Sequence, residues 1–115
     1  MNKNKILIAV PSNNGITIFK KMLGMAMYFY IYNIDKSKQE FVFVEKRGNP
    51  YMQTQQHLKT LDVYELINDC QMILAANIGK NGIERLRDKG VELFFNKGNI
   101  QKALDKILNT EQSIK

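Results

Sequence analysis

Side chains that form disulfides or bind metals are scarce in this sequence. The 115 residues include one cysteine, Cys70, and one histidine, His57. A lone cysteine cannot form a disulfide within the chain, and one thiol with one imidazole cannot supply the Cys and His ligands of a structural zinc site. The sequence therefore excludes a disulfide-stapled scaffold and a Cys/His zinc site built by one chain.

Long hydrophobic runs are also missing, which excludes a membrane-spanning helix of about 20 apolar residues. The first residues show neither a secretory hydrophobic region nor a small-residue cleavage site, so we expect a cytoplasmic protein without a membrane partner. The length predicts a single domain, residues 1–115. A formal net charge of +6 favours anionic partners, but the basic residues are scattered, which disfavours a dedicated nucleic-acid surface.

Apolar runs and turn residues predict the order of the elements. Strands are expected at residues 6–10, 28–34, 41–44, 72–76 and 91–95. Helices are expected at residues 54–69, in a short segment that ends at Gly90, and at 100–108, where apolar residues recur at helical spacing. Residues 110–115 resemble a frayed tail.

The connections between these elements predict the sheet. The short turn after residue 34 makes the two flanking strands antiparallel, whereas helical crossovers require right-handed parallel connections. The strands at 6–10 and 72–76 are apolar throughout and belong in the centre. We therefore predict an α/β fold with ribonuclease H-like topology, a mixed five-stranded sheet of order 3-2-1-4-5 flanked by helices.

Several short strings occur in a recognisable order. They are Ile-Leu-Ile-Ala-Val at 6–10, Tyr-Phe-Tyr-Ile-Tyr at 28–32, Asp-Cys-Gln at 69–71, Ile-Gly at 78–79 with Gly82 and Glu-Arg-Leu at 84–86, Gly-Val-Glu-Leu at 90–93, and Gly-Asn-Ile at 98–100 before Ala103-Leu104. Together, from about residue 5 to residue 108, they resemble the dinitrogenase iron–molybdenum cofactor biosynthesis family. Members bind, carry or help to insert metal–sulfur cofactors.

The resemblance implies a non-catalytic accessory protein like the nitrogenase accessory factors. Such a protein binds an anionic iron–molybdenum or related metal–sulfur cluster and exchanges it with a recipient or donor protein. At residues 22–26, however, Met-Leu-Gly-Met-Ala replaces the His-Phe-Gly-Arg-Ala that is typical of the family. A cofactor-free protein- or anion-binding module on the same fold is therefore the alternative.

Candidate binding residues cluster at one predicted edge of the sheet, because ligands of open α/β sheets bind beyond the carboxyl ends of parallel strands. The predicted cofactor-binding set is Ser12, Asn13, Asn14, Met22, Met25, His57, Asn77, Ile78, Gly79 and Lys80. The backbone N–H groups of the glycine loop at 78–82 and the following helix start suit an anion, with Lys80 adding charge. The equally weighted alternative is that its glycines only permit a tight turn.

Three side-chain types in or near this edge have a plainer interpretation. Met22, Met25 and Met27 carry soft thioethers, but packing beneath the loop is favoured over metal ligation. Cys70 precedes a buried strand, which favours an inert core thiol, and His57 is more easily explained as a surface residue.

Catalytic apparatus is not visible in the sequence. The two central strands contain no Asp or Glu, which argues against a two-metal nuclease. No serine can be placed beside the single histidine as a nucleophile–base pair. We therefore predict a protein that is not an enzyme.

Overall fold

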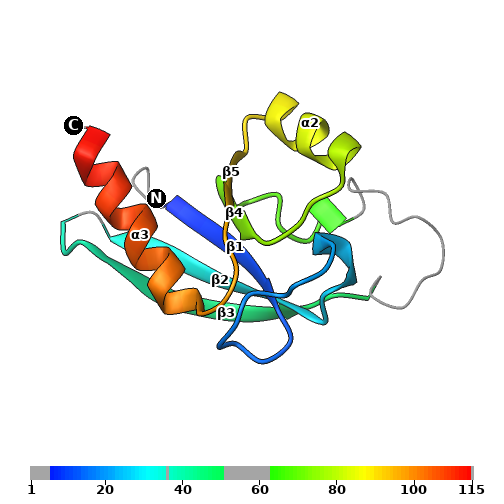
Figure 1. Ribbon diagram of the computed structural model, residues 1–115, viewed down its shortest axis with the longest axis horizontal. Helices are drawn as coiled ribbons and strands as arrows, with labels where there is room; N and C mark the ends of the chain where they lie inside the picture. Colours follow the sequence, from blue (N-terminus) through cyan, green and yellow to red (C-terminus); the bar gives the residue numbers. More distant parts are fainter. Residues whose placement is uncertain (1–5, 36, 51–62, 115) are drawn as a thin grey trace.

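The computed structural model describes residues 6–35, 37–50 and 63–114, the last five through their backbone alone. Its strands are β1 (Ile6–Ser12), β2 (Tyr28–Asp35), β3 (Glu40–Gly48), β4 (Met72–Ala75) and β5 (Glu92–Phe95). The helices that lie wholly within the described residues are a short 3-10 turn, η1 (Leu23–Met25), and the α-helices α2 (Lys80–Asp88) and α3 (Ile100–Ile114) (Figure 1).

The strands form one mixed sheet in the order β3-β2-β1-β4-β5. The β1–β2 and β2–β3 pairs are antiparallel, whereas β1–β4 and β4–β5 are parallel. This confirms the predicted mixed sheet and its order. Membership of the ribonuclease H-like class stays a prediction.

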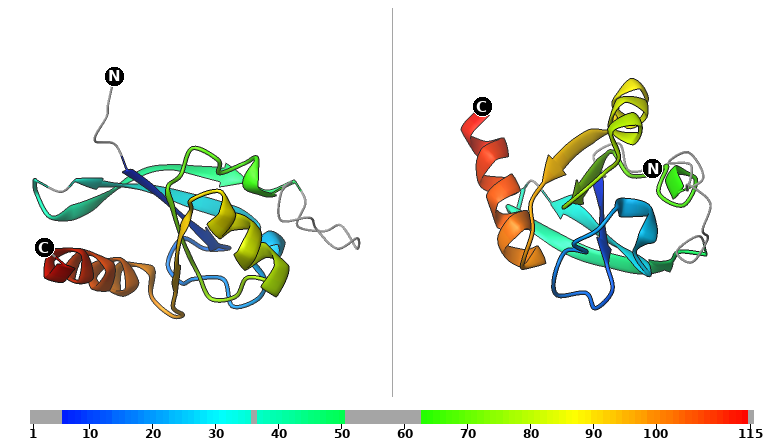
Figure 2. Two further views of the ribbon diagram at one scale, coloured as in Figure 1. Left: turned by 90° about the horizontal axis from the view of Figure 1, so that it is seen from above. Right: turned by 45° about the vertical axis from the view of Figure 1, so that its right-hand side comes forward.

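The continuous apolar run of β1 explains its central position. Alternate side chains of a strand point to opposite faces, and every residue from Leu7 to Ser12 is buried. Leu7 and Ala9 belong to the core beneath α2, and Ile8 and Val10 belong to the core beneath α3. The two helices therefore cover opposite faces of the sheet (Figure 2).

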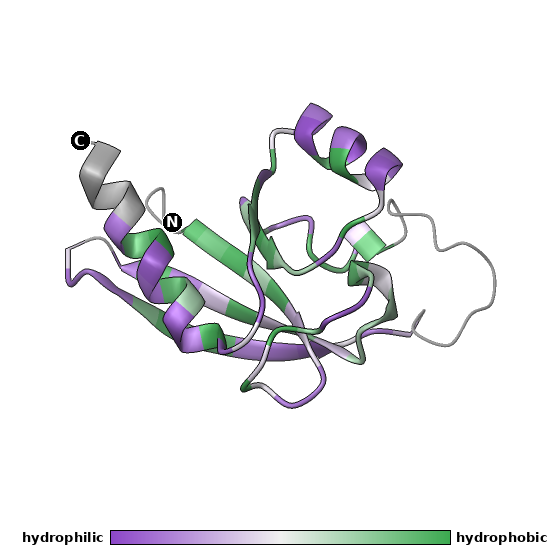
Figure 3. Ribbon diagram, viewed as in Figure 1, coloured by the Kyte–Doolittle hydropathy of each residue, from purple (hydrophilic) through white to green (hydrophobic). Residues whose placement is uncertain are grey.

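Helix α3 has the predicted apolar stripe. Its buried residues are Ile100, Ala103, Leu104, Ile107 and Leu108, and the polar positions between them face away from the sheet (Figure 3). The helix continues to Ile114, so the prediction of a frayed tail over 110–115 is wrong for residues 110–114. No glycine or proline stands between residues 109 and 114 to stop the helix.

Helix α2 begins earlier than expected. Lys80 to Gly82, assigned to a loop from the sequence, form its first turn, and Gly82 is buried there. The last three residues of the expected five-residue glycine loop are therefore helical. Four residues, 76–79, connect the end of β4 to the helix.

The predicted helix over 54–69 falls largely outside the described residues, but its last part is wrong. Only Val63 and Tyr64 are helical, and turns follow up to Asp69. The Leu66 carbonyl, which would accept from Cys70 N–H in an α-helix, accepts instead from Arg47 Nη1 at 2.8 Å. The Cys70 N–H donates to the Ile67 carbonyl, so the tertiary contact with Arg47 coincides with a tighter turn.

Arg47 links β3 to this turn through further bonds. Its Nη1 and Nη2 each donate to one Asp69 carboxylate oxygen at 2.8 Å, and its Nε donates to Glu45 at 2.7 Å. The hydrogen bonds from Arg47 hold the pKa of Asp69 below its ordinary value of 3.8. A bidentate pair of this kind has directional as well as electrostatic strength.

We expect Arg47→Met to lower the free energy of unfolding by about 1–2 kcal/mol, less than for a fully buried pair, because the Asp69 carboxylate is half exposed. A carboxyl with a depressed folded-state pKa stabilises the fold above its unfolded pKa, and this contribution is lost as the pH falls through the folded pKa. As the pH falls below about 4, the free energy of unfolding should therefore decrease less in the variant than in the parent protein. Urea unfolding over a pH series measures both effects. Arg85→Met, at an exposed position of α2, is the control. Equal losses of unfolding free energy in the two variants would contradict a stabilising role for the Arg47–Asp69 pair.

Candidate functional site

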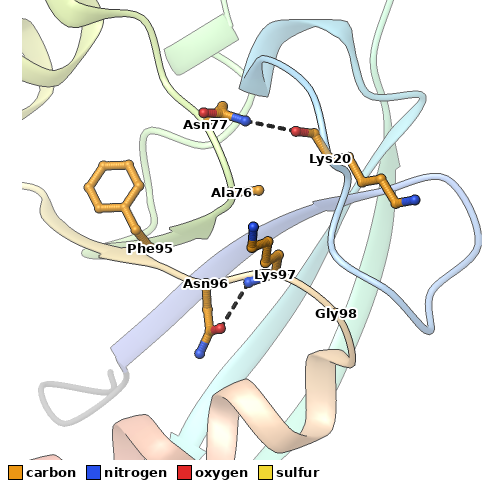
Figure 4. A pocket seen from close by; sticks show the side chains of 7 residues that line it. All are labelled: Lys20, Ala76, Asn77, Phe95, Asn96, Lys97 and Gly98. Carbon is orange, nitrogen blue, oxygen red and sulfur yellow. Dashed lines mark hydrogen bonds between the residues drawn. The ribbon is translucent and has the colours of Figure 1, made fainter.

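A groove of about 880 Å³ lies beyond the carboxyl ends of β4 and β5. Its lining residues are Lys20, Ala76, Asn77, Phe95, Asn96, Lys97 and Gly98 (Figure 4). This is the edge of the sheet where the sequence predicted a ligand site. The predicted residues and the lining residues nevertheless overlap little.

Residues directly after β5 form one side of the groove. Asn96 N–H donates to the Ala75 carbonyl at 3.1 Å, which extends the β4–β5 pairing by one bond. The Asn96 side-chain oxygen accepts from Lys97 N–H at 2.9 Å. The Lys97 side chain extends over the groove toward Ala76 (Figure 4).

Asn77 joins the other side of the groove to the end of β4. Its side-chain amide donates to the Lys20 carbonyl at 2.8 Å, and its backbone carbonyl accepts from Leu23 N–H at 2.9 Å. These bonds hold the second half of the β1–β2 connection against β4. Lys20 stands at the rim, and its side chain extends away from Lys97 (Figure 4).

The groove combines positive charge with an apolar wall. Among the residues that the structure describes, Lys20 and Lys97 are the charged ones that line it, and no Asp or Glu does. Phe95, whose side chain is 45% exposed, and Ala76 provide the apolar surface. Ammonium and amide donors near an apolar wall suit a large anion with low surface charge density.

The predicted residues Ser12, Asn13 and Asn14 organise the β1–β2 connection. Ser12 is fully buried, donates from Oγ to the Thr17 carbonyl at 2.6 Å, and accepts from the N–H groups of Asn14 and Gly15. The Asn13 side-chain oxygen accepts from Met27 N–H at 2.8 Å. All these groups are occupied by the chain itself, which favours a structural role over ligand contact.

Asn14 and Gly15 shape the same turn. The Asn14 side-chain oxygen accepts from the N–H groups of Ile16 and Thr17 at 2.8 and 3.0 Å, as in an Asx turn. Gly15 has φ of +78°, and a Cβ there would stand 2.8 Å from the Tyr30 ring. Both conformation and space therefore require glycine at this position.

The residues predicted after Asn77 stand beside the groove without lining it. Ile78 is buried, and Gly79 is the N-cap of α2, its carbonyl accepting from Ile83 N–H. Lys80 is exposed at the first position of α2. Asn77 is thus the one predicted site residue, among those the structure describes, that lines the groove; His57 lies outside the described residues.

The prediction that the methionines pack beneath the loop is wrong. Met22, Met25 and Met27 are 45%, 48% and 38% exposed. Residues three apart in a 3-10 turn share a side, and Leu23 and Ala26 occupy the inward side here. Met22 and Met25 are consequently directed outward, with the Met22 methyl group 3.2 Å from where a Cβ on Gly79 would stand.

Cys70 is buried in the core, as the favoured interpretation held, and its inertness stays a prediction. It is 3% exposed, and burial, with a smaller contribution from the Asp69 charge, raises the pKa of its thiol to about 12. Over residues 6–35, 37–50 and 63–114, no three His, Cys, Asp or Glu side chains are grouped so as to hold a metal ion. Nor is any described helix long and apolar enough to cross a membrane.

Comparison with known proteins identifies the family. The family model described as dinitrogenase iron-molybdenum cofactor matches residues 4–110. The chain belongs to this family. No curated protein matches the sequence.

Three solved structures have a similar fold. A candidate NifB protein from Thermotoga has a TM-score of 0.62 at 23% identity, covering 90% of this chain and 88% of its own. The apo form of the orange protein from Desulfovibrio gigas has a TM-score of 0.69 at 16% identity, covering 94% and 89%. A candidate dinitrogenase from Methanocaldococcus jannaschii has a TM-score of 0.63 at 14% identity, covering 93% and 91%. At these identities the likeness shows the fold alone.

Sequence reasoning missed Lys20, Asn96 and Lys97. The signal for the last two was present, because they directly follow β5, whose carboxyl end is at the same edge as that of β4. For Lys20, in the middle of a long connection, no local pattern indicates proximity to β4.

We expect Ser12→Ala to reduce the free energy of unfolding by about 1–3 kcal/mol, because it leaves the buried carbonyl and N–H groups of the turn without their side-chain partner. Thermal unfolding measures the loss. Ser37→Ala, at an exposed turn position, is the matched control. A Ser12 variant as stable as the parent would show that the turn is held by other means.

We expect the Cys70 thiol of the folded protein to react very slowly with Ellman's reagent at neutral pH. A pKa near 12 in place of 9.0 lowers the thiolate fraction on the order of a thousandfold, and the thiolate is the reactive form. The same chain in denaturant is the control and should react at the rate of an ordinary thiol. Rapid labelling of the native protein would contradict the buried position.

Proposed function

We propose that this protein is a non-catalytic carrier that binds an anionic metal–sulfur cofactor, iron–molybdenum or related, in the groove beyond β4 and β5. The observation that supports it is a groove whose described lining residues include two lysines and no carboxylate, in a chain that belongs to the dinitrogenase iron-molybdenum cofactor family.

The donor set of the groove fits a cargo that already carries its own sulfide ligands. Cys70 is buried and protonated, so the described residues offer no thiolate. The Lys97 ammonium, which extends over the groove (Figure 4), can instead neutralise charge and donate hydrogen bonds to sulfide or oxo groups. Each charge-assisted contact contributes on the order of 1.5–3 kcal/mol, which suits reversible holding.

The openness of the groove supports delivery more than catalysis. Its described lining residues include no carboxylate, imidazole or thiol that could act as acid, base or nucleophile. A cargo held by side chains at a sheet edge stays accessible to a recipient or donor protein. We include a cytoplasmic location in the proposal, since a free thiol suits a reducing compartment.

We expect Lys97→Glu to weaken binding of tetrathiomolybdate, used as the probe, at least about tenfold, because a favourable charge becomes a repulsive one. Anaerobic titration at low salt, followed by absorbance, measures the affinity. Lys38→Glu is the matched control: it makes the same change of net charge in the β2–β3 turn, at the opposite edge of the sheet.

Two further results discriminate between the alternatives. If Lys80→Glu weakens binding and Lys97→Glu does not, the ligand is held at the start of α2, as the sequence suggested, and the groove is not the site. If neither the parent protein nor any variant takes up the thiometallate, while simpler anions bind, the cofactor-free anion-binding module is the correct function.

A further inference from the structure

An aromatic ring is exposed at the groove beyond β4 and β5. Phe95 is the last residue of β5 and is 45% exposed. It lines the groove together with the small side chain of Ala76 (Figure 4). Apolar surface that stays in contact with water is unfavourable, and covering it recovers free energy in proportion to its area. Phe95 therefore gives the groove an apolar surface that a ligand covers on binding.

Several hydrogen-bond donors of the described lining residues are already used by the chain. The Asn77 side-chain amide donates to the Lys20 carbonyl at 2.8 Å. The Asn96 N–H donates to the Ala75 carbonyl, and the Lys97 N–H donates to the Asn96 side-chain oxygen. The Asn96 side chain itself extends toward α3, away from the Lys97 side chain (Figure 4). The donor that extends over the groove is the Lys97 ammonium (Figure 4).

An ammonium beside an apolar wall distinguishes between anions that have the same charge and shape. Molybdate and tetrathiomolybdate are both tetrahedral dianions, but oxo groups are small and strongly hydrated, whereas sulfur is larger and accepts hydrogen bonds weakly. An oxo group that loses its water beside a phenyl ring, without gaining a new donor, raises the free energy of the complex. A sulfide group loses little hydration there and gains contact with the ring. The groove therefore favours the thioanion.

We propose that Phe95 is the specificity-determining residue of the groove, by which it selects thiometallates over oxoanions of the same charge. Lys97 supplies affinity for either anion, because its charge acts on both. Phe95 supplies the discrimination, because contact with its ring stabilises the sulfide-bearing anion and not the oxoanion. The inference rests on the proposed function, since it concerns the ligand of the same groove, and it adds an uncharged residue as the determinant of ligand class.

Anaerobic equilibrium dialysis of the full chain, once against tetrathiomolybdate and once against molybdate, tests the selection. Low salt and a slightly alkaline buffer keep the charge interactions strong and the thioanion intact, and metal analysis measures the bound fraction of both. We expect the parent protein to bind tetrathiomolybdate at least about tenfold more tightly than molybdate.

Substitutions of Phe95 separate its apolar surface from its mere presence. Phe95→Ser should lower the ratio of the two affinities at least about fivefold, through weaker binding of tetrathiomolybdate, because the apolar area that this anion covers is removed. Phe95→Leu keeps an apolar side chain and should retain most of the ratio. Phe43→Ser is the matched control, since Phe43 is 52% exposed on β3, at the opposite edge of the sheet. Thermal unfolding shows that each variant is folded at the temperature of the dialysis.

The outcomes distinguish this inference from the proposed function. Equal affinity of the parent protein for the two anions overturns the role of Phe95, as does a ratio that Phe95→Ser leaves unchanged or lowers no more than Phe43→Ser does. If Lys97→Glu still weakens tetrathiomolybdate binding in those cases, the proposed function stands and the selection by Phe95 alone is wrong. A parent protein that binds neither anion overturns both.

Discussion

The burial of β1 on both faces is the constraint on which the rest of the structure depends. A strand with no exposed face needs a paired strand on each side and a covering layer above and below, since its backbone groups and apolar side chains are both removed from water. β2 and β4 provide the pairs, and α2 and α3 provide the layers. Because β4 and β5 run parallel to β1, their carboxyl ends meet at one edge, and the groove is at that edge.

Short polar side chains then determine the shape of that edge. Ser12 fixes the turn after β1, Asn77 holds Lys20 against β4, and Asn49 donates to the carbonyls of Gly24 and Ala26 from a buried position. Each of these bonds satisfies backbone groups that a loop would otherwise leave to water. A connection held in this way is organised before a ligand arrives, which lowers the entropy lost on binding.

Positions 22 and 25, where the resemblance noted in the sequence implies histidine and arginine, carry methionines in this chain. Imidazole and guanidinium donate directed hydrogen bonds, whereas the thioethers of Met22 and Met25 do not, and both are turned outward. In the proposed function, charge recognition is therefore supplied by Lys97 after β5, with Lys20 at the rim. A lysine ammonium is a compact point charge on a flexible stem, so it neutralises an anion without imposing a planar geometry on it.

The sequence by itself determined the elements that depend on local periodicity and composition. The apolar runs of β1 and β4, the hairpin turn, the stripe of α3 and the family strings each involve neighbouring residues, and together they were sufficient for the sheet order. Tertiary structure decided what depends on residues far apart in the chain. The contact between Lys20 and Asn77 spans 57 positions, and Arg47 reaches Asp69 across 22. No repeat in the sequence encodes such distances, because the side chains meet only after the sheet has brought their elements together.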